Sequence, residues 1–288
     1  MAISAQEVKE LREKTGAGMM DCKKALTEAD GDFEKAIEVL RKKGASVAAK
    51  RAERNANEGK VLTEIVDDTT GIIVEVNCET DFVAKSDDFI EFADLVMKAV
   101  VASRPASVDE LLTLSVDGKK ISDELSSIIG KIGEKIEISR IKIEEEPNGL
   151  VVDYVHHGSK LGVLIVAENV PGSQKEELKA LLKDFAMQVA AMNPSYVNRD
   201  EVPADVINKE IEIYKEIAKK EGKPEQILDR IAEGKLTKFY QENCLVEQVS
   251  IKDNSKSVQN LIDESNKKHS SQAKVKAFDR FHLSDENK

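Results

Sequence analysis

Apolar residues in the first part of the chain recur at the three- and four-residue spacing of amphipathic helices. A first helix is expected to begin after Ser4. Ser4 and Glu7 match a capping box, in which each side chain accepts a hydrogen bond from the other residue's backbone N–H. A second helix is expected over Asp21–Ala29, and a third helix follows it. The third helix is expected to end at Gly44, which can adopt a left-handed conformation. We therefore predict a three-helix N-terminal domain with a linker at residues 1–55.

After the linker, the apolar pattern changes to the two-residue alternation of strands. Val61–Val66 and Ile72–Val76 flank a turn sequence and predict a β-hairpin. A helix is expected to follow from about Ser86, and another strand over Lys135–Ile143. The apolar phase of that strand slips at Ser139-Arg140, which predicts a β-bulge.

A weak internal repeat relates this segment to the rest of the chain. The shared turn and apolar positions lie at Glu58–Val61 and Gly71–Asn77, and again at Asn148–Val151 and Gly162–Asn169. In each copy an amphipathic helix follows the strands. We therefore predict an α+β fold with two related core halves, residues 56–147 and 148–288, each a small antiparallel sheet with helices on one face.

Two charged helices are expected within the second half, over Ala204–Lys220 and Glu225–Tyr240, separated by a Gly-Lys-Pro break. Their shared apolar seam is narrow and their other faces are charged. This pattern is typical of an antiparallel helical hairpin that projects from the body, at about residues 203–241. The tail, Lys274–Leu283, alternates and is expected to close a sheet.

Composition excludes several classes of protein. The chain has 288 residues, a formal net charge of −11, and 41% hydrophobic residues, which is too many for a disordered chain. An acidic protein is not expected to bind nucleic acid directly. No signal peptide and no membrane span are visible, and the odd number of cysteines argues against a disulfide framework, so a cytoplasmic location is expected.

A local basic segment stands out against this acidic background. Arg41–Arg54 contains six basic residues and one glutamate. It is interpreted either as a solvated helix face or as a basic strip that meets an acidic surface of a partner.

The sequence carries none of the common signatures of catalysis or metal binding. The sequence has no P-loop, no zinc-protease motif, no nucleophile elbow and no Cys-x-x-Cys. His156 and His157 are adjacent, and in a strand they would point to opposite faces and could not chelate one ion. Cys78 precedes Glu79 and Asp81, whose carboxylates would raise a thiol pKa rather than activate it. We therefore predict neither an enzyme nor a protein with a metal or cofactor of its own.

Two motifs carry a resemblance to a known family. Thr15–Leu26, followed by Gly31–Ile37, resembles the N-terminal signature of the bacterial elongation factor Ts family, and Val74–Ala84 resembles its second signature. Similarity continues through most of the chain, including Lys131–Glu134, Tyr154–Gly158 and Gly222–Pro224. The resemblance implies a ubiquitin-associated-like bundle, two related core halves and a protruding coiled-coil hairpin.

The resemblance also implies a function and a partner. Members of this family promote GDP release from elongation factor Tu, which they bind in its GDP-bound and nucleotide-free states. The segment implied to disturb Mg²⁺ in that partner consists of Thr80, Asp81, Phe82 and Val83. Implied partner-binding residues are Met19, Met20, Lys23, Ile132, Gly133, His156, His157 and Gly158, and the sequence leaves open which histidine makes the contact.

Simpler interpretations of the same residues remain open at this level. Thr80 could serve as an N-cap, Phe82 could belong to the core, and the two methionines could be core residues of the N-terminal bundle. A generic binding module is the main rival for the whole chain. A hydrolase that uses Cys78 or His157 is a third alternative, which predicts turnover that Cys78→Ala abolishes.

Overall fold

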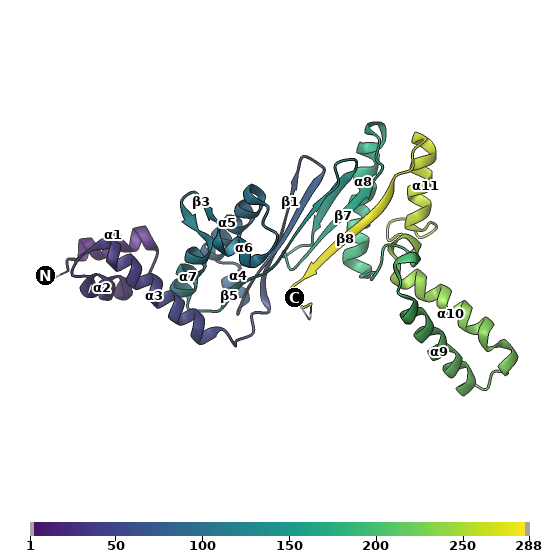
Figure 1. Ribbon diagram of the computed structural model, residues 1–288, viewed down its shortest axis with the longest axis horizontal. Coiled ribbons are helices and arrows are strands. Elements are labelled where there is room, and N and C mark those ends of the chain that lie inside the picture. The colour runs from purple at the N-terminus through teal and green to yellow at the C-terminus, as the bar shows by residue number, and fades with distance from the viewer. Residues whose placement is uncertain (1–2, 286–288) are drawn as a thin grey trace.

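The computed structural model describes residues 3–285, so the first two residues of the predicted N-terminal domain and the last three of the second half lie outside the described residues. The molecule is elongated, with a helical bundle at one end, strands in the middle and a helical hairpin that projects at the other end (Figure 1).

The N-terminal bundle contains α1 (Ala5–Thr15), α2 (Met19–Glu28) and α3 (Phe33–Arg51). The predicted capping box is confirmed, since the Ser4 hydroxyl accepts from the Glu7 N–H and the Glu7 carboxylate accepts from the Ser4 N–H. The bundle has its own small core, formed by Val8, Leu11, Cys22, Ala25, Leu26, Ala29 and Ala36.

The predicted end of the third helix at Gly44 is wrong. α3 continues in helical conformation through Gly44 as far as Arg51. Gly44 is buried against α7 (Ile121–Ile132), where a side chain would collide with the Ser126 carbonyl oxygen. A glycine in a helical sequence indicates either the end of the helix or a close approach of another backbone. At Gly44 the reason is the close approach of α7.

The first half of the body is a three-stranded antiparallel sheet covered by helices on one face. Its strands are β1 (Glu58–Val66), β2 (Thr70–Cys78) and β5 (Ile136–Glu145), in the order β1-β2-β5. Its further elements are α4 (Asp81–Ala84), α5 (Asp87–Ser103), α6 (Val108–Thr113), the short strands β3 (Ser115–Val116) and β4 (Lys119–Lys120), and α7.

Both sequence features expected in this sheet are confirmed. β1 and β2 form the predicted hairpin. The predicted bulge is present too, because Glu75 lies opposite Arg140 while Val76 lies opposite Ile138, which leaves Ser139 as the extra residue.

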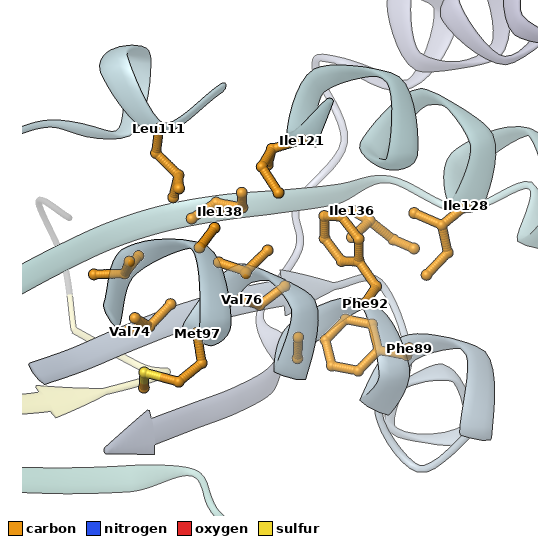
Figure 2. Close-up of a cluster of buried hydrophobic side chains, with 14 of the residues drawn as sticks. Val74, Val76, Phe89, Phe92, Met97, Leu111, Ile121, Ile128, Ile136 and Ile138 are labelled. Carbon is orange, nitrogen blue, oxygen red and sulfur yellow. The ribbon is translucent and has the colours of Figure 1, made fainter. Parts of the chain in front are cut away.

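One face of β2 packs with the helices into the main core of this half. Val74, Val76, Phe89 and Phe92 lie in this cluster (Figure 2). Ser86 begins α5, as predicted, by accepting a hydrogen bond from the Phe89 N–H. This core fixes the end of β2 from which the candidate site extends.

The second half repeats this arrangement. Its strands are β6 (Leu150–Val155), β7 (Leu161–Glu168) and β8 (Lys274–His282), in the antiparallel order β6-β7-β8. The tail therefore closes a sheet, as predicted. The helices of this half are η1 (Gly172–Gln174), α8 (Lys175–Met192), η2 (Arg199–Glu201), α9 (Ala204–Lys220), η3 (Glu225–Ile227), α10 (Leu228–Asn243), η4 (Leu245–Glu247) and α11 (Val258–His269).

The two sheets pack against each other through their helix-free faces. Val61 and Ile73 of the first sheet meet Leu164 and Phe281 of the second. Two glycines at matching positions of the repeat allow this approach: a methyl group on Gly71 would come within 2.5 Å of Val151, and one on Gly162 within 2.6 Å of Val61. The body thus has four layers, helix, sheet, sheet and helix (Figure 1). The predicted α+β class with small antiparallel sheets is confirmed.

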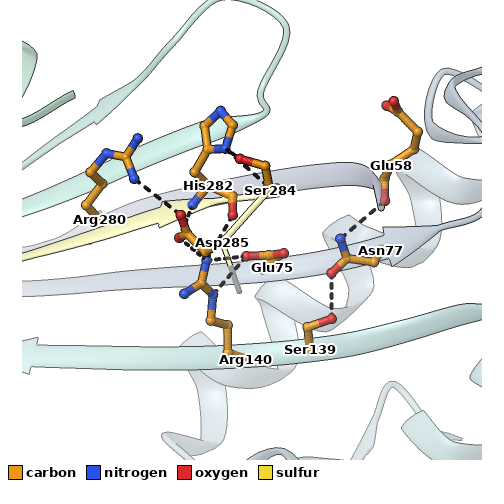
Figure 3. Close-up of polar contacts among 9 residues, drawn as sticks. All are labelled: Glu58, Glu75, Asn77, Ser139, Arg140, Arg280, His282, Ser284 and Asp285. Atoms are coloured by element: carbon orange, nitrogen blue, oxygen red, sulfur yellow. Dashed lines mark hydrogen bonds and ion pairs between the residues drawn. The ribbon is translucent and has the colours of Figure 1, made fainter. Parts of the chain in front are cut away.

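A polar network also joins the two halves. The Arg140 guanidinium of β5 donates to Glu75 of β2 at 2.8 Å and to Asp285, beyond β8, at 2.8 Å (Figure 3). It also lies 4.0 Å from the centre of the Phe281 ring. Glu75 is fully buried, so this arginine compensates a carboxylate in the interior.

The predicted helical hairpin is formed by α9 and α10, with the turn between them (Figure 1). Its seam differs in part from the expected one. Ala218, Leu228 and Ala232 are buried, whereas Ile217 and Ile227, which were expected in the seam, are 38% and 41% exposed. Among the helices of residues 3–285, none has the length and apolarity that a bilayer span requires.

Candidate functional site

The Thr80–Val83 segment forms the start of a single helical turn, α4, directly after β2. Thr80 is the N-cap, and its hydroxyl accepts a hydrogen bond from the Val83 N–H at 3.4 Å. The N-cap interpretation of Thr80 is therefore confirmed. The cap places this short turn at the edge of the first core, where it is fixed by its flanks.

Phe82 points out of the molecule, and the interpretation that it belongs to the core is wrong. Its side chain is 82% exposed, more than any other large apolar residue in the described part of the chain. The next two residues, Val83 and Ala84, pack on the core instead. Because α4 has one turn, burying Val83 and Ala84 leaves the Phe82 ring in solvent.

A turn from the other side of the core supports this segment. α7 ends at Ile132 and is capped by Gly133, which has φ 80°, and the next residue, Glu134, contacts Thr80. The Thr80 N–H donates to Glu134 Oε2 at 3.1 Å, and the Thr80 hydroxyl donates to Oε1 at 3.0 Å. Ile132 and Gly133, which the resemblance implies to be partner-binding residues, directly precede this glutamate in the chain.

A second support holds the residue before Thr80. The Glu79 carboxylate accepts from Arg51 at 2.8 Å, from Arg54 at 3.0 Å and from the Lys135 N–H at 2.6 Å. Burial opposes ionisation of Glu79, but these hydrogen bonds outweigh it and lower its pKa to about 2. Glu79 is thus a charged anchor that joins α3, β2 and β5.

The sequence analysis did not predict the Glu79 anchor or the contact between Glu134 and Thr80. Both glutamates are visible there, in the segments that resemble the family. Their roles depend on contacts with residues 25 to 56 positions away in the chain, which spacing does not reveal.

The basic segment Arg41–Arg54 is mostly exposed, in line with the solvated-face interpretation, but much of its charge is paired within the chain. Arg51 and Arg54 bind Glu79, Arg41 pairs with Asp123, and Lys43 pairs with Asp21. Four of its six basic residues therefore pair with the protein's own carboxylates.

Asp81 adds a negative charge beside Phe82. Its carboxylate accepts from Lys85 at 2.7 Å, and this hydrogen bond keeps its pKa below the usual range. Lys160, from the second half, contributes to the same effect through its charge. Asp81 is therefore ionised at neutral pH, and its side chain is 45% exposed.

The β6–β7 turn brings the second half to the same end of the molecule. The Val61 N–H donates to the Ser159 carbonyl at 2.7 Å, and Lys160 binds Glu58 at 2.6 Å. His156, His157 and Gly158 are exposed in this turn.

His156 and His157 lie outside the strand, so the strand geometry used in the sequence analysis does not apply to them. The strand ends at Val155, before both residues, because the chain reverses there into the β6–β7 turn. The Tyr154 hydroxyl lies 2.8 Å from His156 Nδ1. Within residues 3–285, no group of three or more His, Cys, Asp or Glu side chains is placed to hold a metal ion.

The remaining predicted contacts lie on the N-terminal bundle. Met19 and Met20, in the first turn of α2, are 58% and 63% exposed, so the interpretation of these methionines as core residues is wrong. Lys23, one turn further on, is exposed as well. These three residues form a surface separate from α4.

The geometry gives no support to a cysteine nucleophile. Cys78 is fully buried, and its thiol donates to the Thr80 carbonyl at 3.2 Å. Burial, together with the charge of Glu134, raises the pKa of this thiol to about 12. The thiolate required for nucleophilic attack is therefore scarce at neutral pH.

Comparison with known proteins adds independent information. A sequence profile of the family described as "Elongation factor TS" matches residues 79–285. The chain is 48% identical to Elongation factor Ts of Chlorobaculum parvum and to that of Chlorobium phaeobacteroides, with 98% of both chains covered in each comparison. It is 47% identical to Elongation factor Ts of Clostridium botulinum, covering 97% of this chain and 92% of the relative.

Together, these similarities place the protein in the class of translation elongation factors. Within that class, the chain belongs to the elongation factor Ts family.

Proposed function

We propose that this protein is a guanine-nucleotide exchange factor that binds the GDP complex of elongation factor Tu in the cytoplasm and promotes the release of GDP. The observation that carries the proposal is the exposed Phe82 ring on a short helical turn held by Glu79 and Glu134. Membership in the elongation factor Ts family supports the choice of partner.

Such a factor needs no nucleophile, metal or cofactor of its own. It must bind its partner more tightly when the nucleotide pocket is empty than when GDP and Mg²⁺ fill it. By linkage, the factor then weakens nucleotide binding by the same ratio. A thousandfold weakening corresponds to about 4 kcal/mol of differential contact energy.

Phe82 and Asp81 suit this task for different reasons. An aromatic ring buries a large apolar area with little loss of side-chain entropy, so Phe82 can act as a wedge in a partner surface. Asp81 is an ionised carboxylate, which can attract cations and donors away from a phosphate site and repels the phosphate charge itself. Since Mg²⁺ neutralises phosphate charge, displacing it lowers the affinity for GDP.

Thr80 and Val83 hold the wedge rather than form it. Thr80 caps the turn, and Val83 fastens it to the core. Ile132 and Gly133 extend the same surface. Both of these residues are partly buried. We propose two further contact surfaces, and all of their residues are exposed: Met19, Met20 and Lys23 on α2, and His156, His157 and Gly158 on the β6–β7 turn. No direct contact with nucleic acid or membrane is proposed.

The test measures release of fluorescent GDP from preloaded elongation factor Tu by stopped flow, at substoichiometric amounts of this protein. Wild-type protein should drive repeated rounds of release. Phe82→Ala and Asp81→Ala should fold normally and lose most of the activity, because both side chains are largely outside the core. Met192→Ala is a matched control, since Met192 is also an exposed large apolar residue, at 51%, and lies on α8.

Unchanged release rates in both α4 variants would contradict the wedge mechanism. Binding of elongation factor Tu without any release by the wild-type protein would favour the generic binding module instead.

A further inference from the structure

The N-terminal bundle meets the body chiefly where α3 crosses α7. At the crossing the two backbones lie against each other at a pair of glycines. A methyl group on Gly44 would overlap the Ser126 carbonyl oxygen, and one on Gly130 would come within 3.0 Å of the Gly44 Cα. Glycine costs about 1 kcal/mol relative to alanine inside a helix, so its presence here follows from the close approach.

Contacts around the crossing make it a fixed joint. Val47 and Ala48, one turn after Gly44, pack on the core of the first half. Arg41, one turn before it, pairs with Asp123 of α7. The angle between the helices is therefore set where the bundle meets the body.

Both crossing helices lead to the Phe82 segment. α7 ends in the turn whose Glu134 binds Thr80. α3 ends at Arg51, which binds Glu79. At its other end α3 packs against α2, which carries Met19 and Met20. With 19 residues, α3 is a strut of about 28 Å between the two surfaces.

We propose that Gly44 is a positioning residue for nucleotide exchange: its close contact with α7 sets the direction of α3, so that the α2 surface and Phe82 reach one partner molecule together. This inference rests on the proposed function. Two surfaces on one rigid body bind cooperatively only when both reach their targets, because the second contact then forms at high effective concentration.

Gly44→Ala tests this arrangement. The added methyl group forces α3 and α7 apart, which swings the bundle. α4 keeps the supports that do not involve α3, namely the hydrogen bonds of Thr80 with Glu134 and of the Lys135 N–H with Glu79. In the GDP-release assay, the concentration of this protein that gives half-maximal release should rise about tenfold or more, with the limiting rate unchanged. Gly234→Ala is the matched control: Gly234 also lies inside a helix, α10, but its added methyl group meets nothing within 4 Å.

A double-mutant cycle separates positioning from a loss of stability. Met19→Ala should raise the half-maximal concentration in the wild-type background and have little further effect alongside Gly44→Ala, because the bundle no longer reaches its target. Additive effects of the two substitutions would overturn the inference. A folded Gly44→Ala protein with the wild-type half-maximal concentration would overturn it as well.

Gly130→Ala provides a milder version of the same perturbation if Gly44→Ala does not fold. Failure of both variants to fold would overturn the inference, because the crossing would then be a requirement for folding. The proposed function fails separately, if wild-type protein and Gly234→Ala both leave GDP release unchanged.

Discussion

At position 82 an aromatic ring lies in solvent although a core is close at hand. Burying a phenylalanine side chain stabilises a protein by about 1.5–3 kcal/mol, and here that stabilisation is not used within the chain. The neighbouring Val83 does pack on the core. The sequence Asp81-Phe82-Val83 does not say which apolar residue is buried, because a helix of one turn has no repeated pattern to reveal its inner face.

Removing the support from Glu134 should affect both stability and exchange. In Glu134→Ala, Thr80 loses the side chain that accepts from its N–H and hydroxyl, which should destabilise the fold by about 1–2 kcal/mol. Phe82 is then less well positioned, and we expect the limiting rate of GDP release to fall about three- to tenfold. Thermal unfolding and the stopped-flow assay measure the two effects.

Glu134→Gln is the matched control, because its amide keeps one oxygen that can accept from Thr80. It should lie between wild type and Glu134→Ala in both measurements. A Glu134→Ala protein with wild-type release would show that the turn from α7 does not position Phe82.

On the scale of secondary-structure elements, the candidate site is built from element ends. β2 ends at Cys78, α3 and α7 end nearby, and β5 begins there. Glu79 is the residue that joins three of these ends, through Arg51, Arg54 and the Lys135 N–H. Element ends carry free polar groups, so one carboxylate can satisfy several of them.

The Glu79 anchor should give a defined dependence of stability on pH. Its pKa is lowered from an ordinary value of 4.5 to about 2 in the folded protein, so its contribution is fully present above pH 4.5 and is lost as the pH falls toward 2. Glu79→Gln should therefore have a lower melting temperature than wild type at pH 6, and this difference should shrink between pH 4.5 and 2.

Melting temperatures of both proteins across this range measure the effect. Glu233→Gln, which changes an exposed glutamate of α10, should track wild type at every pH. A difference between Glu79→Gln and wild type that stays constant from pH 6 to pH 2 would contradict the assignment.

At the scale of the whole molecule, two similar halves are placed with their sheets face to face. Helices cover the outer faces, and Gly71 and Gly162 allow the inner faces to meet (Figure 1). This arrangement brings α4 from the first half and the β6–β7 turn from the second to the same end. The N-terminal bundle and the helical hairpin extend from opposite ends of this body.

The polar link between the halves should matter for stability. Arg140 contacts Glu75, Asp285 and the Phe281 ring across the two sheets, and its side chain is 20% exposed (Figure 3). Arg140→Ala leaves the buried Glu75 carboxylate without this cation and should lower the free energy of unfolding by about 3 kcal/mol. Chemical denaturation measures this change.

Arg230→Ala serves as the control, because Arg230 is exposed on α10. It should unfold like wild type. If both arginine variants had wild-type stability, the link between the halves would not stabilise the fold.

Local patterns in the sequence determined the elements and much of their detail. Ser4 with Glu7, the strand hairpin, the bulge at Ser139 and the break in the helical hairpin follow from side-chain periodicity and from the conformations that glycine and proline favour. The motif Val74–Ala84 contains the Phe82 segment, and the motif Thr15–Leu26 contains Met19 and Met20.

Tertiary structure alone decided what those elements do together. It carried α3 through Gly44, turned Phe82 and the two methionines outward, and paired most of the basic segment with the chain's own carboxylates. It also placed His156 and His157 in a turn beside the first half. The reason is physical: periodicity reports on neighbours a few positions away, whereas burial and ion pairing here are set by groups many residues distant in the chain.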